Sequence, residues 1–71
     1  MSFEDEKVKI GREIQKRREF KSLSIQALAD HVNMERSGLS KLEKGKAENP
    51  TLKTLYRIAE ALDVRISDLV K

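Results

Sequence analysis

Apolar residues recur along most of this chain three or four positions apart, which is the spacing of one face of an α-helix. No stretch alternates apolar and polar residues in the way that a half-buried strand does. The apolar stripes and the polar breaks between them predict five helices, at about 3–21, 25–32, 35–44, 52–63 and 68–71. We therefore expect an all-α domain.

The first and fourth of these stripes predict much of the core. The first consists of Val8, Ile10, Gly11 and Ile14, and the fourth of Leu52, Leu55, Ile58, Ala59 and Leu62, with Tyr56 at its edge. Hydroxyl side chains precede most of the helices and are expected to cap them. They are Ser2, Ser24, Thr51 and Ser67, and Ser2 has capping-box spacing to Asp5.

The stretch 24–45 predicts two short helices joined by a tight turn. Its first half carries four apolar residues at helical spacing, and Asn33, which tolerates the left-handed conformation of a turn, ends that pattern. In the second half, Leu39 and Leu42 are expected to face inward. The opposite side is polar and basic and consists of Arg36, Ser37, Ser40, Lys41 and Lys44. A helix with such a surface suits the DNA major groove.

Two glycines mark this stretch. Gly45 is suited to the position just after a helix, where the chain turns with a positive φ. Gly38 lies inside the second helix, where glycine costs about 1 kcal/mol relative to alanine. Gly38 either allows a close approach or is merely tolerated, and we expect a close approach of DNA or of the preceding helix.

The composition excludes several classes of protein. Seventy-one residues form one small domain with a modest core. Cysteine is absent and His31, expected on the surface, is the single histidine, so neither a thiolate metal site nor a catalytic set is indicated. No apolar run approaches the roughly 18 residues of a membrane span, and no signal peptide opens the chain. We expect a cytoplasmic protein that is not an enzyme and has no cofactor, metal or small-molecule ligand.

The net charge of +3 is unevenly distributed. The segment 36–57 contains six basic and two acidic residues and so carries +4, while the rest of the chain sums to −1. A basic surface of this kind suits a polyanion such as double-stranded DNA. An ordinary solvated helix surface would show a similar charge distribution, so charge alone leaves both interpretations open.

Short motifs follow one another from residue 23 onward. They are Leu23-Ser24, Leu28-Ala29, Arg36-Ser37, Leu39-Ser40, Leu42-Glu43-Lys44-Gly45-Lys46 and Asn49-Pro50, followed by the apolar helix 52–62. In this order they resemble the Cro/repressor-type helix-turn-helix family, also called the xenobiotic-response-element type. The likeness extends over about residues 8–70. It implies a compact five-helix, lambda-repressor-like DNA-binding domain.

The resemblance assigns roles to polar residues. Arg36, Ser37 and Lys41 match the family's base-reading positions, with Ser40 beside them, and both arginine and lysine can reach the acceptors of guanine. The residues implied to contact phosphates are Ser24, Gln26, Lys44, Lys46, Asn49 and Thr51.

Four positions depart from the family pattern. Ser22 stands where glycine is common, and Glu48 stands where a basic residue is common. Ile25 stands where the family often has a phosphate-binding glutamine, so this contact falls to Gln26. Glu35 stands where a small N-cap residue is usual, and its carboxylate could accept a hydrogen bond from a cytosine amino group.

The resemblance also implies contacts within and between domains. Arg18 and Glu43 match a family pair that forms a salt bridge between the first and third helices. Family members commonly bind palindromic half-sites as two-fold dimers. The apolar residues near the end of the chain provide the expected dimer interface, namely Ile66, Leu69 and Val70. The alternative is that they cap the core of their own chain, which is expected above all of Leu69. Phe20, which has charged neighbours, is a second candidate contact.

These observations predict a sequence-specific, homodimeric transcriptional regulator. Repression is favoured because steric occlusion of a promoter needs no further surface, although the acidic residues Glu13, Glu19 and Asp30 would allow activation. A phage-type repressor, a restriction–modification controller, an antitoxin and a regulator of a mobile element all fit. The alternative is a protein-interaction module that binds a protein partner, such as a toxin, through the same surface.

Overall fold

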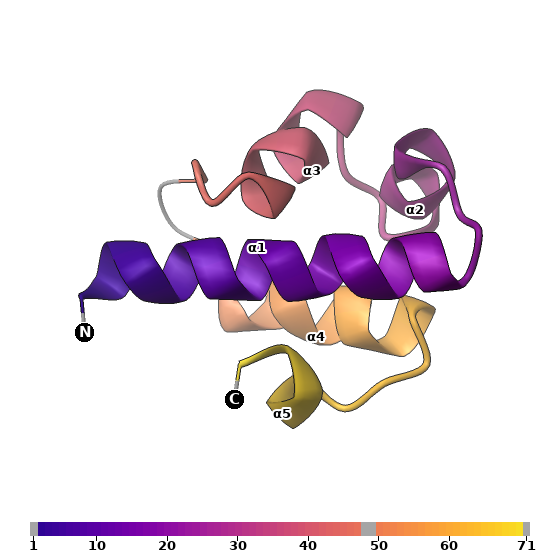
Figure 1. Cartoon of the computed structure of the whole chain (residues 1–71). Coiled ribbons are helices and arrows are strands. Elements are labelled where there is room, and N and C mark those ends of the chain that lie inside the picture. Colours follow the sequence, from indigo (N-terminus) through magenta and orange to yellow (C-terminus); the bar gives the residue numbers. More distant parts are fainter. Residues whose placement is uncertain (1, 48–49, 71) are drawn as a thin grey trace.

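The computed structural model describes residues 2–47 and 50–70, and the elements within them are helices (Figure 1). The helices are α1 (Phe3–Phe20), α2 (Ile25–His31), α3 (Arg36–Glu43), α4 (Leu52–Ala61) and α5 (Ile66–Leu69). The predicted all-α class is confirmed, and each bound lies within two residues of the expected one.

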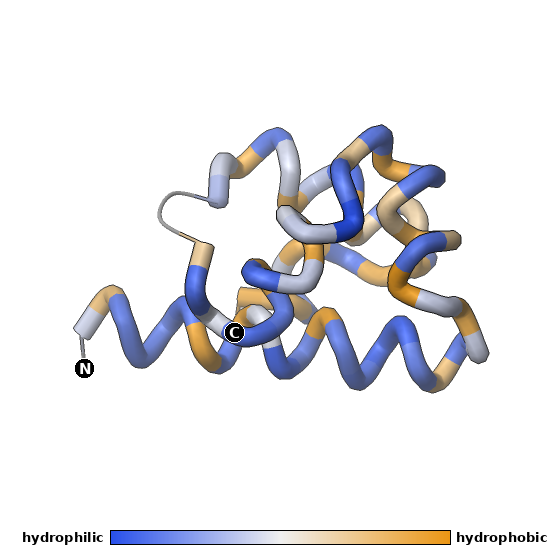
Figure 2. Tube along the Cα trace, turned by 90° about the horizontal axis from the view of Figure 1, so that it is seen from above, coloured by the Kyte–Doolittle hydropathy of each residue, from blue (hydrophilic) through white to orange (hydrophobic). Residues whose placement is uncertain are grey.

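Helix α1 is the longest element, and the others are arranged around it. In the view of Figure 1, α2 and α3 lie above α1, and α4 and α5 lie below it. From above, Figure 2 shows the other helices along one side of α1, whose own trace is mostly hydrophilic. Helix α1 packs against α3 and α5, and α2 packs against α3 and α4.

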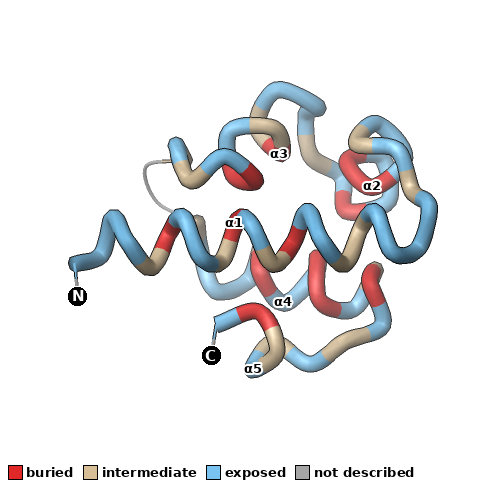
Figure 3. Tube along the Cα trace, viewed as in Figure 1, coloured by how far each residue is buried: buried red, intermediate tan, exposed pale blue. Residues whose placement is uncertain are grey.

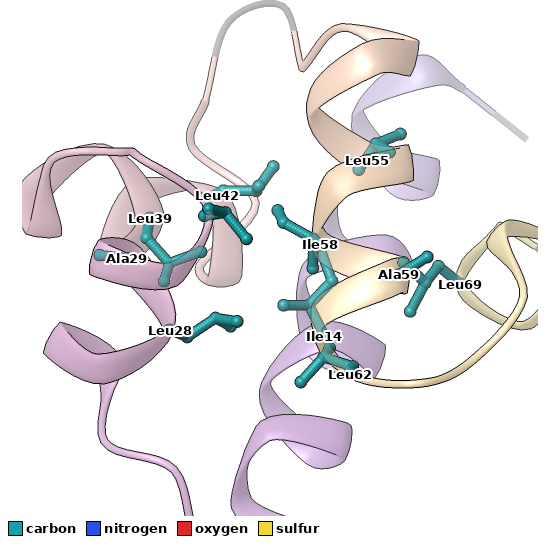
Figure 4. Close-up of a cluster of buried hydrophobic side chains, with 11 residues drawn as sticks. Ile14, Leu28, Ala29, Leu39, Leu42, Leu55, Ile58, Ala59, Leu62 and Leu69 are labelled. Carbon is teal, nitrogen blue, oxygen red and sulfur yellow. The ribbon is translucent and has the colours of Figure 1, made fainter.

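One core joins all the helices (Figures 3 and 4). Ile14 of α1, Leu28 of α2, Leu39 of α3 and Ile58 of α4 are fully buried, and Leu69 of α5 is 2% exposed. Burial of each such aliphatic side chain contributes about 1.5–3 kcal/mol. These contacts therefore hold the short helices in place.

The structure corrects two predicted core residues. Val8 falls on the apolar stripe of α1, yet it is 40% exposed. Leu52 falls on the apolar stripe of α4, yet it is 72% exposed. It lies in the first turn of α4, one turn before Leu55, which is the first α4 residue of the core. Helical spacing predicted the face of the helix correctly but not the point at which the core ends.

Most of the predicted helix ends are confirmed. The hydroxyl oxygens of Ser24 and Thr51 accept hydrogen bonds from the backbone N–H groups three residues later, at 3.0 and 3.1 Å. Asn33 and Gly45 have φ angles of 58° and 73°, as turns of this kind require. The Ser2–Asp5 capping box is also present.

The expected cap at Ser67 is wrong. Helix α5 begins at Ile66, and the backbone N–H of Arg65 donates a hydrogen bond to Asp68 Oδ2 at 3.0 Å. The carboxylate of Asp68 thus stabilises a start two residues before the expected one. As a result, α5 turns Leu69 into the core.

Helices α1 and α3 approach each other closely at a glycine that was not expected to allow it. A Cβ atom added to Gly11 would lie 2.3 Å from the backbone oxygen of Leu42, so only glycine allows α1 and α3 this contact. At Gly38, within the described residues, an added Cβ would meet only Met34 Cε, at 3.8 Å. The expected approach of Gly38 to the preceding helix is therefore wrong.

Candidate nucleic-acid interface

Helix α3 has one buried and one open face. Leu39 and Leu42 are 0% and 4% exposed, whereas Arg36, Ser37 and Lys41 are exposed. The remaining predicted base-reading residue, Ser40, is half-buried. In the part of the chain that the structure describes, neither Arg36 nor Lys41 forms an ion pair. Their donors are therefore available to a ligand in front of α3.

The first turn of α3 is open as well. Glu35 occupies the N-cap position, and its side chain makes no capping hydrogen bond. The carboxylate is exposed and can accept a hydrogen bond from an external donor.

The predicted phosphate-binding residues flank α3. In Figure 1, α3 lies between α2 and the segment that follows α3. Ser24 is the N-cap of α2 and Thr51 is the N-cap of α4, and the side chains of Lys44 and Lys46 are exposed. Asn49 lies outside the described residues.

Gln26 is exposed but already has a partner. Its Nε2 donates a hydrogen bond to Asp30 Oδ1 at 2.8 Å, one helical turn later. One N–H of the amide and its oxygen remain available to a ligand. A phosphate would thus meet this glutamine beside an acidic neighbour.

The predicted ion pair between α1 and α3 is present. Arg18 Nε lies 2.7 Å from Glu43 Oε2, and Arg18 Nη2 lies 3.1 Å from Glu43 Oε1. The side chains are only 12% and 5% exposed. The guanidinium also donates to the backbone oxygen of Leu23 at 2.8 Å, in the turn before α2. One side chain thus fixes both helices of the helix-turn-helix unit to α1.

The environment of this pair keeps Arg18 charged. Its hydrogen bonds to the Glu43 carboxylate raise the pKa of Arg18, and desolvation by burial opposes the rise only in part. A raised pKa means that the stability contributed by the Arg18 proton is fully present below the usual pKa of arginine and is lost only above that value. The attachment of α3 is therefore insensitive to any loss of the Arg18 proton near neutral pH.

A second attachment, which sequence reasoning missed, joins α1 to the segment after α3. The Nζ of Lys7 donates a hydrogen bond to the backbone oxygen of Ala47 at 2.9 Å and lies 3.1 Å from Glu4 Oε2. Its side chain is 8% exposed. Lys7 has helical spacing to Gly11 and Ile14, the other buried residues of α1. That spacing was the available signal, but lysine is rarely buried, so the spacing alone did not indicate a buried Lys7.

The expected dimer residues differ in accessibility. Val70 is 42% exposed and Ile66 is half-buried, but Leu69 packs into the core of its own chain. Because α5 folds back against α1 and α4, the Leu69 side chain is not available for a partner, and we remove it from the interface. Leu52 and Tyr56, which are 72% and 56% exposed, line a shallow apolar depression together with Lys53 and Ile66.

The described residues contain no group of three acidic, histidine or cysteine side chains placed to hold a metal ion. His31 is exposed, as expected. None of the described helices is both long and apolar enough to cross a membrane. Phe20 is 88% exposed at the end of α1.

Comparison with known proteins identifies a DNA-binding family. The family profile of the Cro/C1-type HTH DNA-binding domain matches residues 13–71. The chain is 41% identical over 61 residues to the prophage-derived HTH-type transcriptional regulator YonR of Bacillus subtilis, covering 86% of this chain and 56% of YonR. The chain thus spans about half the length of the curated relatives that it matches.

Solved structures show the same fold. The restriction–modification controller protein C.AhdI from Aeromonas hydrophila superimposes with a TM-score of 0.82 at 32% identity, covering 87% of this chain and 92% of that one. The biofilm regulator SinR, solved in complex with DNA, gives 0.82 at 31% identity, covering 87% and 98%. The fold also forms 34% of hydroxypropylphosphonic acid epoxidase from S. wedmorenis, with a TM-score of 0.84 at 26% identity over 92% of this chain.

Proposed function

The chain belongs to the Cro/C1-type helix-turn-helix DNA-binding family, and from this we propose that it is a sequence-specific transcriptional regulator that binds its operator as a homodimer, with α3 in the major groove. The observation that carries the proposal is the division of α3 into a core face and an open polar face. Its relatives are transcriptional regulators, and we propose no catalytic activity for this chain.

Base recognition falls to the open face of α3. Arg36 and Lys41 bind guanine O6 and N7, and Ser37 and Ser40 donate to or accept from neighbouring base edges. The support for these roles is exposure and the lack of competing ion pairs for the two cations among the described residues.

Phosphate contacts orient the domain on the duplex without reading sequence. We assign them to residues on both sides of α3, namely Ser24, Gln26, Lys44, Lys46, Asn49 and Thr51. The N-cap positions of Ser24 and Thr51 favour this role, because helix N-termini attract anions.

A second copy of this chain is the proposed occupant of the apolar surface formed by Leu52, Tyr56, Ile66 and Val70, which we call the α4–α5 patch. In Figure 1, α4 and α5 lie on the opposite side of α1 from α3, so a dimer formed there leaves the recognition helix uncovered. A monomer of this size covers only one half-site, and two-fold pairing doubles the number of base contacts.

For the biological setting we propose only a group of candidates. A repressor encoded by a phage or mobile element, a restriction–modification controller and an antitoxin remain the candidates, and repression is favoured over activation. Such a regulator acts where the chromosome lies, which places it in the cytoplasm. We propose no small-molecule ligand.

Selection of bound duplexes from random DNA tests the function. The expected result is a palindromic site whose half-sites lie about one helical turn apart. Binding to that site should weaken steeply with salt, because each neutralised phosphate contributes roughly −0.9 to the slope of log K against log salt. Failure to enrich any site would refute DNA recognition and favour the protein-interaction module instead.

A further inference from the structure

The segment that follows α3, residues 44–47, is held against α1 at two points. At its start, Gly45 lies so close to α1 that an added Cβ would be 2.8 Å from the Cα of Val8. At its end, the backbone oxygen of Ala47 accepts a hydrogen bond from Lys7 Nζ at 2.9 Å. The exposed Lys46 lies between these two points, and its own N–H donates to the Lys41 backbone oxygen at 2.8 Å.

The ammonium group of Lys7 is occupied within the protein. Besides the Ala47 oxygen, it has Glu4 Oε2 at 3.1 Å and lies 5.2 Å from the centroid of the Phe3 ring. With 8% of its side chain exposed, Lys7 is poorly placed to meet a phosphate directly. A buried lysine that reaches a backbone oxygen 40 residues away is better explained by the segment it holds.

We propose that Lys7 is a positioning residue for DNA binding, which holds the backbone of Ala47 against α1 so that Lys46 meets a phosphate of the bound duplex. This inference rests on the proposed function. Lys7 acts through Lys46 and contributes no direct contact. The segment is already ordered in the free protein, so DNA binding does not carry the entropy cost of ordering it.

The substitution Lys7→Met tests this proposal, because it keeps most of the aliphatic stem and removes the donor. Its matched control is Lys9→Met, which removes the same charge from an exposed position on α1. Affinity for the selected operator and for an unrelated duplex is measured by fluorescence anisotropy at several salt concentrations. We expect K7M to weaken binding to both duplexes by about tenfold and to reduce the salt slope by about 1 per protomer. K9M should change the affinity less than about twofold.

A thermodynamic cycle with Lys46→Met identifies the route of the effect. If Lys7 acts through Lys46, the double variant K7M/K46M binds no more weakly than K46M alone. Additive losses, or a K7M protein that behaves like K9M, would overturn the proposal. If the wild-type protein binds no DNA at all, the proposed function fails first, and the two failures are thus distinguishable.

A second variant covers the case in which K7M does not fold, as judged by far-UV circular dichroism. Gly45→Ala displaces the same segment from Val8 and changes no charge. Folded G45A should weaken binding to both duplexes as K7M does. Unchanged affinity in folded G45A would refute the proposal.

Discussion

The carboxylate of Glu43 accepts two hydrogen bonds from the guanidinium of Arg18, which lies 25 residues earlier in the chain. The same guanidinium binds the backbone oxygen of Leu23. Helix α1 thus sets the position of the last turn of α3 and of the turn that leads into α2. The recognition surface depends on a helix that contributes none of the proposed base contacts.

Loss of this pair should destabilise the whole domain. Arg18→Met leaves the Glu43 carboxylate largely buried without its partner, and removal of one member of a buried pair costs about 3–5 kcal/mol. Urea denaturation followed by circular dichroism measures the change. The adjacent Arg17 offers a matched control, because its pair with Glu13 leaves Arg17 33% exposed.

The control substitution Arg17→Met should cost less than about 1 kcal/mol. Equal losses for R17M and R18M would show that the Arg18–Glu43 pair has no special role. If only R18M is destabilised, the pair is the main polar link between α1 and α3.

Base recognition should depend on the two exposed cations of α3. Each of the substitutions Arg36→Ala and Lys41→Ala should weaken binding to the selected operator by about 1–3 kcal/mol and relax the preference at one base pair. Both residues are exposed, so the unfolding midpoint should not change. Anisotropy titration with the operator and with single-base variants measures the effect.

Arg12→Ala is the control for this prediction, since Arg12 is an exposed arginine on α1. The substitution should lower the affinity for DNA only slightly, and by the same factor for the operator as for an unrelated duplex. If R36A and K41A both retained the wild-type preference at every base pair, α3 would not be the recognition helix.

Much of this arrangement could be predicted from local signals. Apolar spacing predicted the helices, and Asn33 and Gly45 indicated the turns, because the φ angles of 58° and 73° found there favour asparagine and glycine. The Arg18–Glu43 contact joins residues that are distant in the sequence, and its prediction came from a family resemblance. Physical reasoning from spacing alone could not have paired two residues on different helices.

The errors about which side chains are buried share one cause. Val8 and Leu52 were predicted from helical periodicity to lie in the core, and Leu69 was placed at the dimer interface. In the structure Val8 and Leu52 are exposed and Leu69 is buried. Periodicity shows which residues share a face but not what covers that face. That depends on the tertiary packing of α5 against α1 and α4. The same limit concealed Lys7, whose burial needs the Ala47 oxygen from a distant segment.

Two exposed apolar surfaces compete as the dimer interface, and a charge placed on each can distinguish them. Leu52→Asp alters the α4–α5 patch at a residue that is 72% exposed, so the fold should tolerate it. We expect the dissociation constant of the dimer to rise at least about tenfold, because a buried unpaired charge costs well over 1.4 kcal/mol. Sedimentation equilibrium measures this constant directly.

Phe20→Asp is the counterpart on the other surface, at a side chain that is 88% exposed. It should leave dimerisation unchanged. The opposite outcome, in which F20D dissociates the dimer and L52D does not, would move the interface to the end of α1. It would also exclude Ile66 and Val70 from self-association.

Substitution of the two helical glycines by alanine should change the stability of the domain in opposite directions. Gly11→Ala places a Cβ 2.3 Å from the Leu42 oxygen and so must push α1 and α3 apart, which should destabilise the domain by about 1–3 kcal/mol. Gly38→Ala meets only the flexible end of Met34 and should stabilise it by about 0.5–1 kcal/mol through helix propensity. Thermal unfolding of both variants measures the two effects. If G38A gains stability and yet loses operator affinity, Gly38 is needed for close contact with DNA. If G38A retains the wild-type affinity, the expected close approach of DNA at Gly38 is wrong as well.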